Sequence, residues 1–230
     1  MATTGPVPAL PALATVVAEL KPRLRGWLHT YAAAVSVASG ATLIAVAAAL
    51  RGAAAGTTTA IYAATVTLLF GTSALYHRRR WSARGAAIMK RLDHSMIFVF
   101  IAGTYTPIAV LTLSHTAAIA VLIVVWTGAA VGVGLKTTWP TAPRWVGVPC
   151  YVGLGWVAAF VLPDLLHNGG VATLSLVLAG GVVYTIGGVV YGLKKPNPVP
   201  GVFGFHEVFH ACTLVAATCH YVAIWLAVFR

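Results

Sequence analysis

Five side chains of the kinds that bind metal ions or move protons lie beside apolar stretches of this 230-residue chain. His77 lies in SALYH, Asp93 in RLDHSM, and His206, Glu207 and His210 in FHEVFH. An ionisable side chain in or beside a membrane-spanning segment costs free energy unless it is paired or ligated. Each of the five therefore requires a partner, a ligand or a function.

Two of these histidines, His206 and His210, are four residues apart and so share one face of a helix. Three neutral imidazoles with water in the fourth position describe a catalytic zinc site, whereas thiolates are typical of structural zinc. His77 can supply the third imidazole. The sequence thus predicts a zinc ion held by His77, His206 and His210.

Asp93 and Ser73 are the candidates for catalysis beside this zinc site. Asp93 can hold and orient water on the metal as general base or as a partner of a ligand. Ser73 lies one helical turn before His77, on the same face, where its hydroxyl can bond the same water or a substrate carbonyl.

Other interpretations of these residues stay open. Asp93 could pair with Lys90 or Arg91, and the histidines could be solvated at the membrane interface. HEVFH also matches HExxH, in which two histidines bind zinc and the glutamate is the base of a metalloprotease. A membrane protease with Glu207 as its base is therefore a competing hypothesis.

The remaining histidines are left out of the predicted site. His94 points about 100° away from its neighbour on a helix. His29, His115 and His167 are expected in loops or at the membrane interface, and His220 is expected to hydrogen-bond another helix from mid-span.

The elements that position these residues must be membrane helices. The chain is 59% hydrophobic and 8% charged, with a mean hydropathy of +0.88, whereas soluble domains are about 25% charged. A bilayer core needs about 20 apolar residues per helix. We predict an all-α membrane protein with a tail and short helix at 1–28 and a seven-helix transmembrane domain at 29–230. The expected spans are 29–50, 57–77, 92–112, 115–135, 146–163, 170–192 and 206–229.

The basic residues orient these seven spans. Only Arg51 and Arg230 fall on one side of the predicted membrane, and the others fall on the opposite side. Those others are Lys21, Arg23, Arg25, Arg78, Arg79, Arg80, Arg84, Lys90, Arg91, Lys136, Arg144, Lys194 and Lys195. The positive-inside rule then puts the N-terminus in the cytoplasm, the C-terminus outside and the five candidate residues near the cytoplasmic leaflet. Contact with anionic lipid headgroups explains this charge better than nucleic-acid binding does.

The sequence also predicts the form of two connections between spans. A turn around Ser114 and His115 must be tight, and KKPNPVPG at 194–201 forces a non-helical loop before the last span.

Several motifs together resemble the hemolysin III branch of the progestin and adipoQ receptor (PAQR) family, which is related to the alkaline ceramidases. They are KPRLRGWLH at 21–29, SALYH at 73–77, LDHSMIF at 92–98, AGTYTP at 102–107 and HEVFH at 206–210. The resemblance implies seven spans with the N-terminus inside. It also implies zinc on His77, His206 and His210, with Asp93 reaching the ion through water and Ser73 as the serine of S-x-x-x-H.

One motif departs from the family. Many relatives have Glu and Asn shortly before the first-span histidine, but Arg25, Gly26, Trp27 and Leu28 precede His29 here. No role is carried over for this motif, and with the third ligand supplied by the second span Glu207 becomes optional.

We therefore expect a multi-pass protein of the bacterial plasma membrane that hydrolyses an amide or ester bond in a membrane lipid. The alternative is a receptor-like or homeostatic protein with a structural zinc and a lipid-sensing cavity. Pore formation is disfavoured, because no ring of charged residues or polar stripe runs through the spans.

Overall fold

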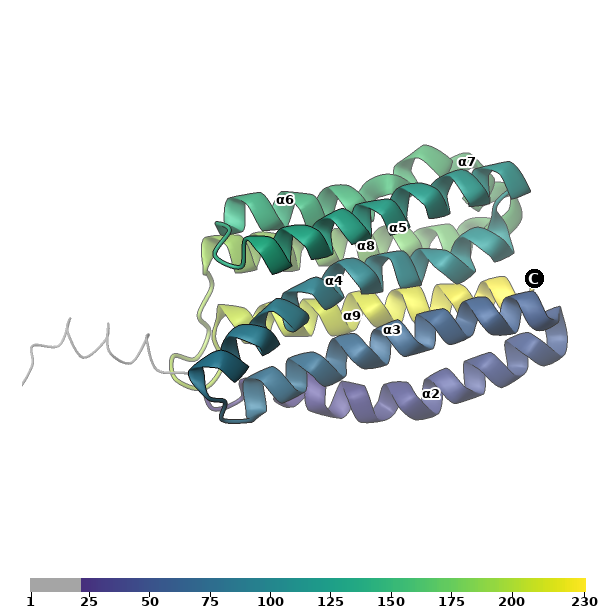
Figure 1. Cartoon of the computed structure of the whole chain (residues 1–230). Coiled ribbons are helices and arrows are strands. Elements are labelled where there is room, and N and C mark those ends of the chain that lie inside the picture. Colours follow the sequence, from purple (N-terminus) through teal and green to yellow (C-terminus); the bar gives the residue numbers. More distant parts are fainter. Residues whose placement is uncertain (1–21) are drawn as a thin grey trace, which may run out of the picture.

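The computed structural model describes residues 22–230, and the predicted tail and short helix up to residue 21 lie outside the described residues. Long helices run roughly parallel or antiparallel and form a bundle (Figure 1). They are α2 (Trp27–Arg51), α3 (Ala53–Arg78), α4 (Ala83–Thr112), α5 (His115–Thr138), α6 (Arg144–Gly155), α8 (Gly170–Leu193) and α9 (Phe205–Val228). Between α6 and α8 lie three short helical pieces, η1 (Trp156–Val161), α7 (Leu162–Asp164) and η2 (Leu165–Gly169).

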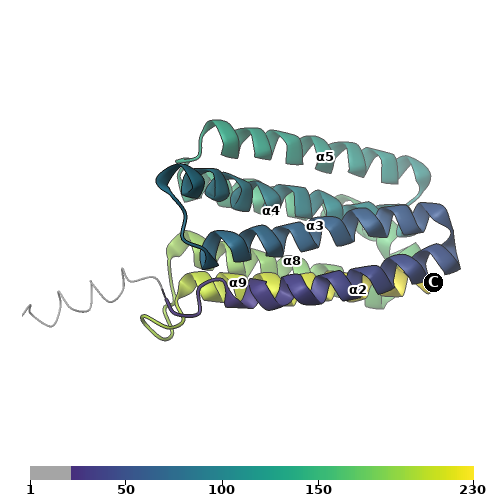
Figure 2. The ribbon, with the colours of Figure 1, turned by 60° about the horizontal axis from the view of Figure 1, so that its bottom comes forward.

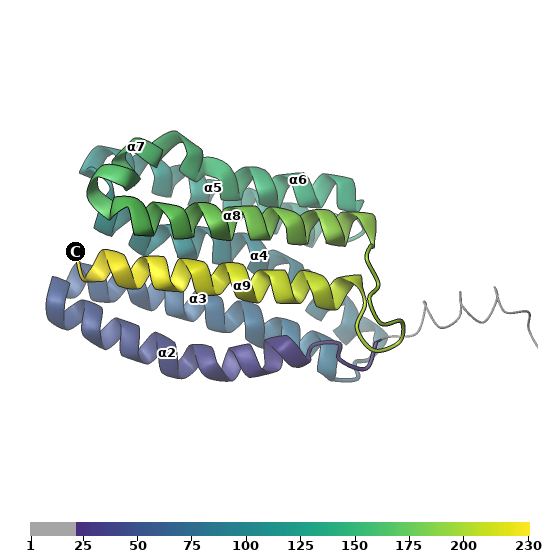
Figure 3. The same cartoon turned by 180° about the vertical axis from the view of Figure 1, so that it is seen from behind.

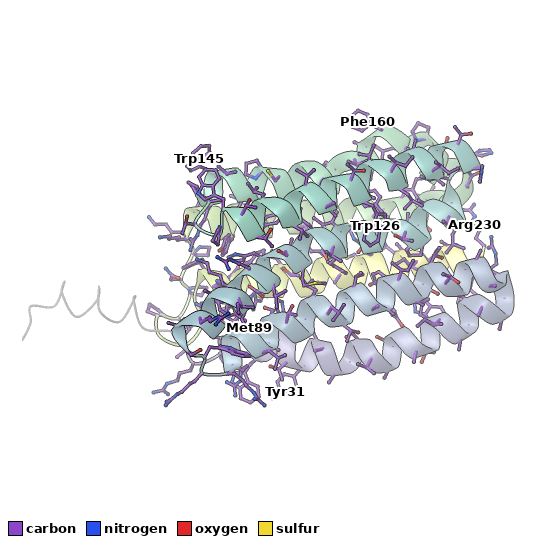
Figure 4. All side chains as sticks on the ribbon, in the orientation of Figure 1. Tyr31, Met89, Trp126, Trp145, Phe160 and Arg230 are labelled. Atoms are coloured by element: carbon purple, nitrogen blue, oxygen red, sulfur yellow. The ribbon has the colours of Figure 1, made fainter. Side chains whose placement is uncertain are left out.

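Six helical runs in the described part of the chain are long and apolar enough to cross a membrane. One of them, Arg144–Leu193, is a continuous run of 50 residues. It reverses direction where Gly170 adopts a φ of 81°, and α8 returns along the bundle (Figure 3). Large apolar side chains such as Trp145 and Phe160 project outward from the bundle (Figure 4). These features make the protein a multi-pass helical membrane protein.

The segment from α6 to η2 is a broken helix, whereas one regular span was expected at 146–163. The Tyr105 hydroxyl inserts into its backbone ladder, donating to Gly155 O at 2.6 Å and accepting from Ala158 N at 2.7 Å. A side chain inserted in this way interrupts the i→i−4 pattern of an α-helix. The helix accordingly changes to 3₁₀ geometry at Trp156.

α4 begins nine positions earlier than the expected start at residue 92. Ser82 caps it, its hydroxyl accepting from Gly85 N at 3.2 Å. The extra turns carry the basic residues of RGAAIMKR, which an apolar window leaves out. The tight turn expected at Ser114 is confirmed, because α4 ends at Thr112 and α5 begins at His115.

α9 packs in the interior of the bundle, against α2, α4 and α8. Figures 2 and 3 show it running beside α2 on one side and α8 on the other. Its buried residues Ala223 and Ile224 belong to one apolar core with Leu43, Tyr62 and Phe100. This placement brings the first turns of α9 next to the last turn of α3.

The loop before α9 is non-helical, as expected. Its backbone is hydrogen-bonded to the residues that precede α2. Arg23 N donates to Gly201 O at 3.0 Å, and Leu24 N donates to Val202 O at 3.2 Å. Backbone hydrogen bonds therefore connect the start of the described chain to the loop that leads into α9.

Candidate metal centre

Three histidines meet where the end of α3 lies beside the start of α9. The Nε2 atoms of His77 and His206 are 3.2 Å apart, and His210 follows one turn later on α9. One ring nitrogen from each lies within 4.8 Å of the other two, a group that could hold a metal ion. His77 and His210 are 7% and 2% exposed. The structure thus brings together the three residues that the sequence singled out.

The donor set fits a tetrahedral metal ion. Zinc–nitrogen bonds of about 2.0–2.1 Å put tetrahedral ligand atoms about 3.4 Å apart. The His77–His206 separation of 3.2 Å already matches this spacing, and the 4.8 Å limit leaves a small closing movement for the third ring. His210 Nδ1 is buried without a hydrogen-bond partner among the described residues, so this ring has an unused nitrogen.

Asp93 lies beside this trio on α4. Its Oδ2 is 4.0 Å from His77 Nε2, and the Ser73 hydroxyl hydrogen-bonds the carboxylate. The two ion pairs among residues 22–230 are Arg25–Glu207 and His77–Asp93, so the alternative pairing of Asp93 with Lys90 or Arg91 is not found.

Glu207 is 1% exposed, and each of its two carboxylate oxygens has a partner. Its Oε2 accepts from Gly204 N at 2.8 Å, which caps its own helix. Its Oε1 accepts from Arg25 Nε in a buried ion pair. Both oxygens of this carboxylate thus already have a structural partner, which weakens the protease hypothesis.

His29 lies next to the cluster, and the expectation that it is a loop or interface residue is wrong. It is 3% exposed, and its ring stacks on that of His210 at 3.8 Å between centroids and 14° between planes. Both of its ring nitrogens are buried among the described residues. α2 and α9 begin at the same end of the bundle (Figure 1), and this relation could have placed His29 beside His206.

The turn that leads into α2 also touches the cluster. Gly26 adopts a φ of 83°, and a Cβ at this position would be 2.7 Å from His77 Cβ. Only glycine adopts this conformation without strain and leaves this space. The RGWLH segment, for which no role was predicted, thus packs against the candidate ligands.

Of the other histidines, His220 accords with its prediction. Its Nε2 bonds Val177 O on α8 at 3.2 Å. His115 and His167 are exposed, and His94 lines the same cavity as the trio.

A cavity of about 700 Å³ opens beside the histidines. Asp93, Ser73 and all three candidate ligands line it at one end. Most of the remaining lining is apolar and includes Ile101, Ile108, Leu165 and Val177. Its size is within the range of small-molecule sites, and its lining suits an amphiphile with a polar group at the histidine end.

One family model matches nearly the whole chain, and individual relatives match parts of it. A family model described as "Haemolysin-III related" matches residues 17–221. "Hemolysin-3" of Bacillus cereus is 30% identical over 135 residues, which are 59% of this chain and 61% of that protein. The "Hemolysin-3 homolog" of Bacillus subtilis (strain 168) is 29% identical over 154 residues, 67% of this chain and 69% of that protein. The "ADIPOR-like receptor IZH2" of Saccharomyces cerevisiae is 45% identical over 49 residues, 19% of this chain and 16% of that protein.

Proposed function

Because the chain belongs to the haemolysin-III related family, which is of the PAQR type, we propose that it is a zinc-dependent membrane hydrolase with seven passes. The observation that carries this proposal is the position of His77, His206 and His210 at the polar end of an apolar cavity, beside Asp93. Water, a general base and a lipid can meet there.

Seven passes follow when the reversal at Gly170 divides Arg144–Leu193 into two crossings, one broken and one regular. An odd number of crossings puts the two chain ends on opposite sides. The basic connections then share one side with the histidines, and the positive-inside rule makes that side cytoplasmic.

Zinc is the proposed ion because neutral imidazoles in a tetrahedral arrangement suit it, and because carboxylate oxygens, which magnesium and calcium prefer, are scarce here. When bound by three imidazoles, zinc supplies Lewis-acid chemistry at the fourth position. A bacterial plasma membrane is the proposed location, because the two Bacillus proteins are 30% and 29% identical over more than half of this chain.

Asp93 is the proposed general base. Its carboxylate takes a proton from the attacking water as the oxygen–carbon bond forms, and returns it to the leaving nitrogen or oxygen as the amide or ester bond breaks. Ser73 supports the carboxylate through the hydrogen bond between the two side chains. Its single hydroxyl proton could instead turn to a substrate carbonyl once Asp93 has taken up a proton. The apolar cavity orients the acyl chain and keeps bulk water from the reacting bond.

A second candidate function is lipid sensing with a structural metal. It is favoured by the match to a yeast protein named as an ADIPOR-like receptor, which covers 49 residues. In this case the cavity binds a lipid and the ion fixes α3 to α9 without turnover.

The test is elemental analysis of the purified protein beside His206→Ala and His210→Ala, followed by assays of lipid-amide and lipid-ester hydrolysis. His167→Ala is the matched control, because His167 is exposed and lies outside the cluster. We expect one zinc per chain in the wild type and the control, none in the two variants, and turnover only in the zinc-loaded samples. Zinc without turnover of any lipid would favour sensing, and a wild type free of zinc would refute the metal site.

A further inference from the structure

One of the basic residues expected in a cytoplasmic connection is instead buried inside the bundle. Lys136 belongs to the last turn of α5, is 6% exposed and lines the same cavity as the histidines and Asp93. An ammonium group that faces a largely apolar cavity inside a membrane bundle is stabilised by an anionic or strongly polar partner.

No carboxylate of the described chain supplies that partner. The ion pairs among residues 22–230 join Arg25 to Glu207 and His77 to Asp93. Lys136 Nζ lies 5.5 Å from the centre of the Tyr151 ring, which is a weak cation–π distance. The charge of Lys136 is therefore left uncompensated on the cavity side.

Gly147 on α6 makes room for this ammonium group. A Cβ on Gly147 would lie 2.6 Å from Lys136 Nζ, so any larger residue would displace the lysine tip. The Lys136 side chain thus fits against a gap in the facing helix.

Further cations surround the same end of the cavity. Lys90 and Arg144 line the same cavity as Lys136 and His94. Arg144 is fixed by a 3.1 Å hydrogen bond to Tyr191 O and lies 4.5 Å above the Tyr191 ring. Among the described lining residues Asp93 is the one carboxylate, so the polar end of the cavity carries an excess of positive charge.

We propose that Lys136, with Lys90 and Arg144, binds the phosphate headgroup of a single-chain acyl lipid whose chain occupies the apolar part of the cavity. A phosphate monoester carries up to two negative charges and several acceptor oxygens, which suits three convergent cations better than a single carboxylate would. This inference rests on the proposed hydrolase, because it names the headgroup class of the substrate. The headgroup lies toward the cytoplasmic end, and the acyl bond lies between it and the chain, beside Asp93.

The test measures affinities of purified protein in detergent micelles by thermophoresis. The probes are oleoyl lysophosphatidic acid, mono-oleoylglycerol with the same acyl chain, and inorganic phosphate. We expect the phosphorylated lipid to bind about tenfold more tightly than the neutral lipid, and inorganic phosphate to bind weakly because it lacks the chain.

Lys136→Met should abolish this preference while leaving the affinity for mono-oleoylglycerol unchanged, and Lys136→Arg should retain it. Lys195→Met is the matched control, because it removes an exposed cytoplasmic lysine outside the cavity. Gly147→Ala keeps the charge but displaces the ammonium, and should lower the preference on its own. Unchanged zinc content and unfolding temperature would exclude misfolding of the variants.

Equal affinities for the two lipids, or a preference that persists in Lys136→Met, would overturn the headgroup site. Tight binding of inorganic phosphate without any gain from the chain would show a soluble-anion site and would overturn its lipid assignment. Hydrolysis of neutral lipids with no headgroup preference would support the proposed hydrolase and overturn the headgroup site. A headgroup preference without turnover of any lipid would support the headgroup site and refute the proposed hydrolase.

Discussion

Gly26 packs directly against His77, so the turn before the first described helix supports a candidate metal ligand at the end of the second. The left-handed backbone of Gly26 and the 2.7 Å that would separate its Cβ from His77 Cβ leave space for hydrogen alone. The position of His77 is thus set by the N-terminal turn as well as by α3.

Gly26→Ala should weaken metal binding by about tenfold, within the range found for residues that orient metal ligands. The matched control is Gly52→Ala, because Gly52 has a similar φ of 79° but no atom within 4 Å of a built Cβ. Backbone strain should cost Gly26→Ala about 1 kcal/mol, and it should cost Gly52→Ala about 1–3 kcal/mol, because Gly52 has a ψ of −175° whereas Gly26 has a ψ of −8°. Titration with zinc and a competing chelator checks this, and equal zinc affinity in the two variants would contradict it.

His29→Ala should also lower metal affinity, because His29 stacks on His210 and restrains its ring. His29→Phe should keep the affinity within about threefold, since a phenyl ring preserves the stack. His115→Ala, at an exposed position, serves as the control. If His29→Phe lost metal as fully as His29→Ala, a nitrogen of His29 would be the important group, and the stacking role would be refuted.

Asp93→Asn should keep zinc and lose turnover by about 10²–10⁴-fold, the usual contribution of a general base. Ser73→Ala should lower turnover by less, about tenfold, because Ser73 acts by holding the Asp93 carboxylate. Steady-state kinetics with zinc content measured on the same samples separate the two effects. Loss of zinc in Asp93→Asn would make Asp93 a ligand instead.

Glu207→Gln should keep metal and turnover per folded molecule, because the glutamine can still cap α9. It should lower stability by about 2 kcal/mol through loss of the buried bond to the Arg25 guanidinium, whose side chain is 17% exposed. Thermal unfolding of Glu207→Gln, Arg25→Gln and the double variant gives the coupling between them. A collapse of turnover in Glu207→Gln with normal zinc would revive the protease-type base.

Opposite locations of the two chain ends distinguish seven passes from six. A fusion of alkaline phosphatase to the C-terminus should be active in a bacterial host, and a fluorescent reporter fused there should be dark. The reverse result would show that Arg144–Leu193 contributes a single crossing.

Composition and residue spacing were enough to predict the helical membrane fold, the non-helical loop at 194–201 and the meeting of His77, His206 and His210. These depend on local apolar length and on which helix ends share a side. Positive residues at helix ends were less predictable, because Lys136 looks like a loop residue when only the side of the membrane is considered. Its direction depends on the gap at Gly147 in another helix.

Contacts between segments far apart in the chain could also not be predicted from the sequence. The break after Gly155 is made by Tyr105 from a different helix, and Arg25 meets Glu207 across 182 positions. Neither pair has a local signal, because each depends on which helices become neighbours once the bundle has formed.

The separation of the candidate ligands along the chain has a consequence for biosynthesis. His77 and His206 are 129 residues apart, on α3 and α9. Until α9 packs beside α3, each of the two helices offers only its own part of the candidate ligand set. The candidate site is therefore assembled only when these two helices meet, and a chain in which α9 has not inserted could not present all three imidazoles to an ion.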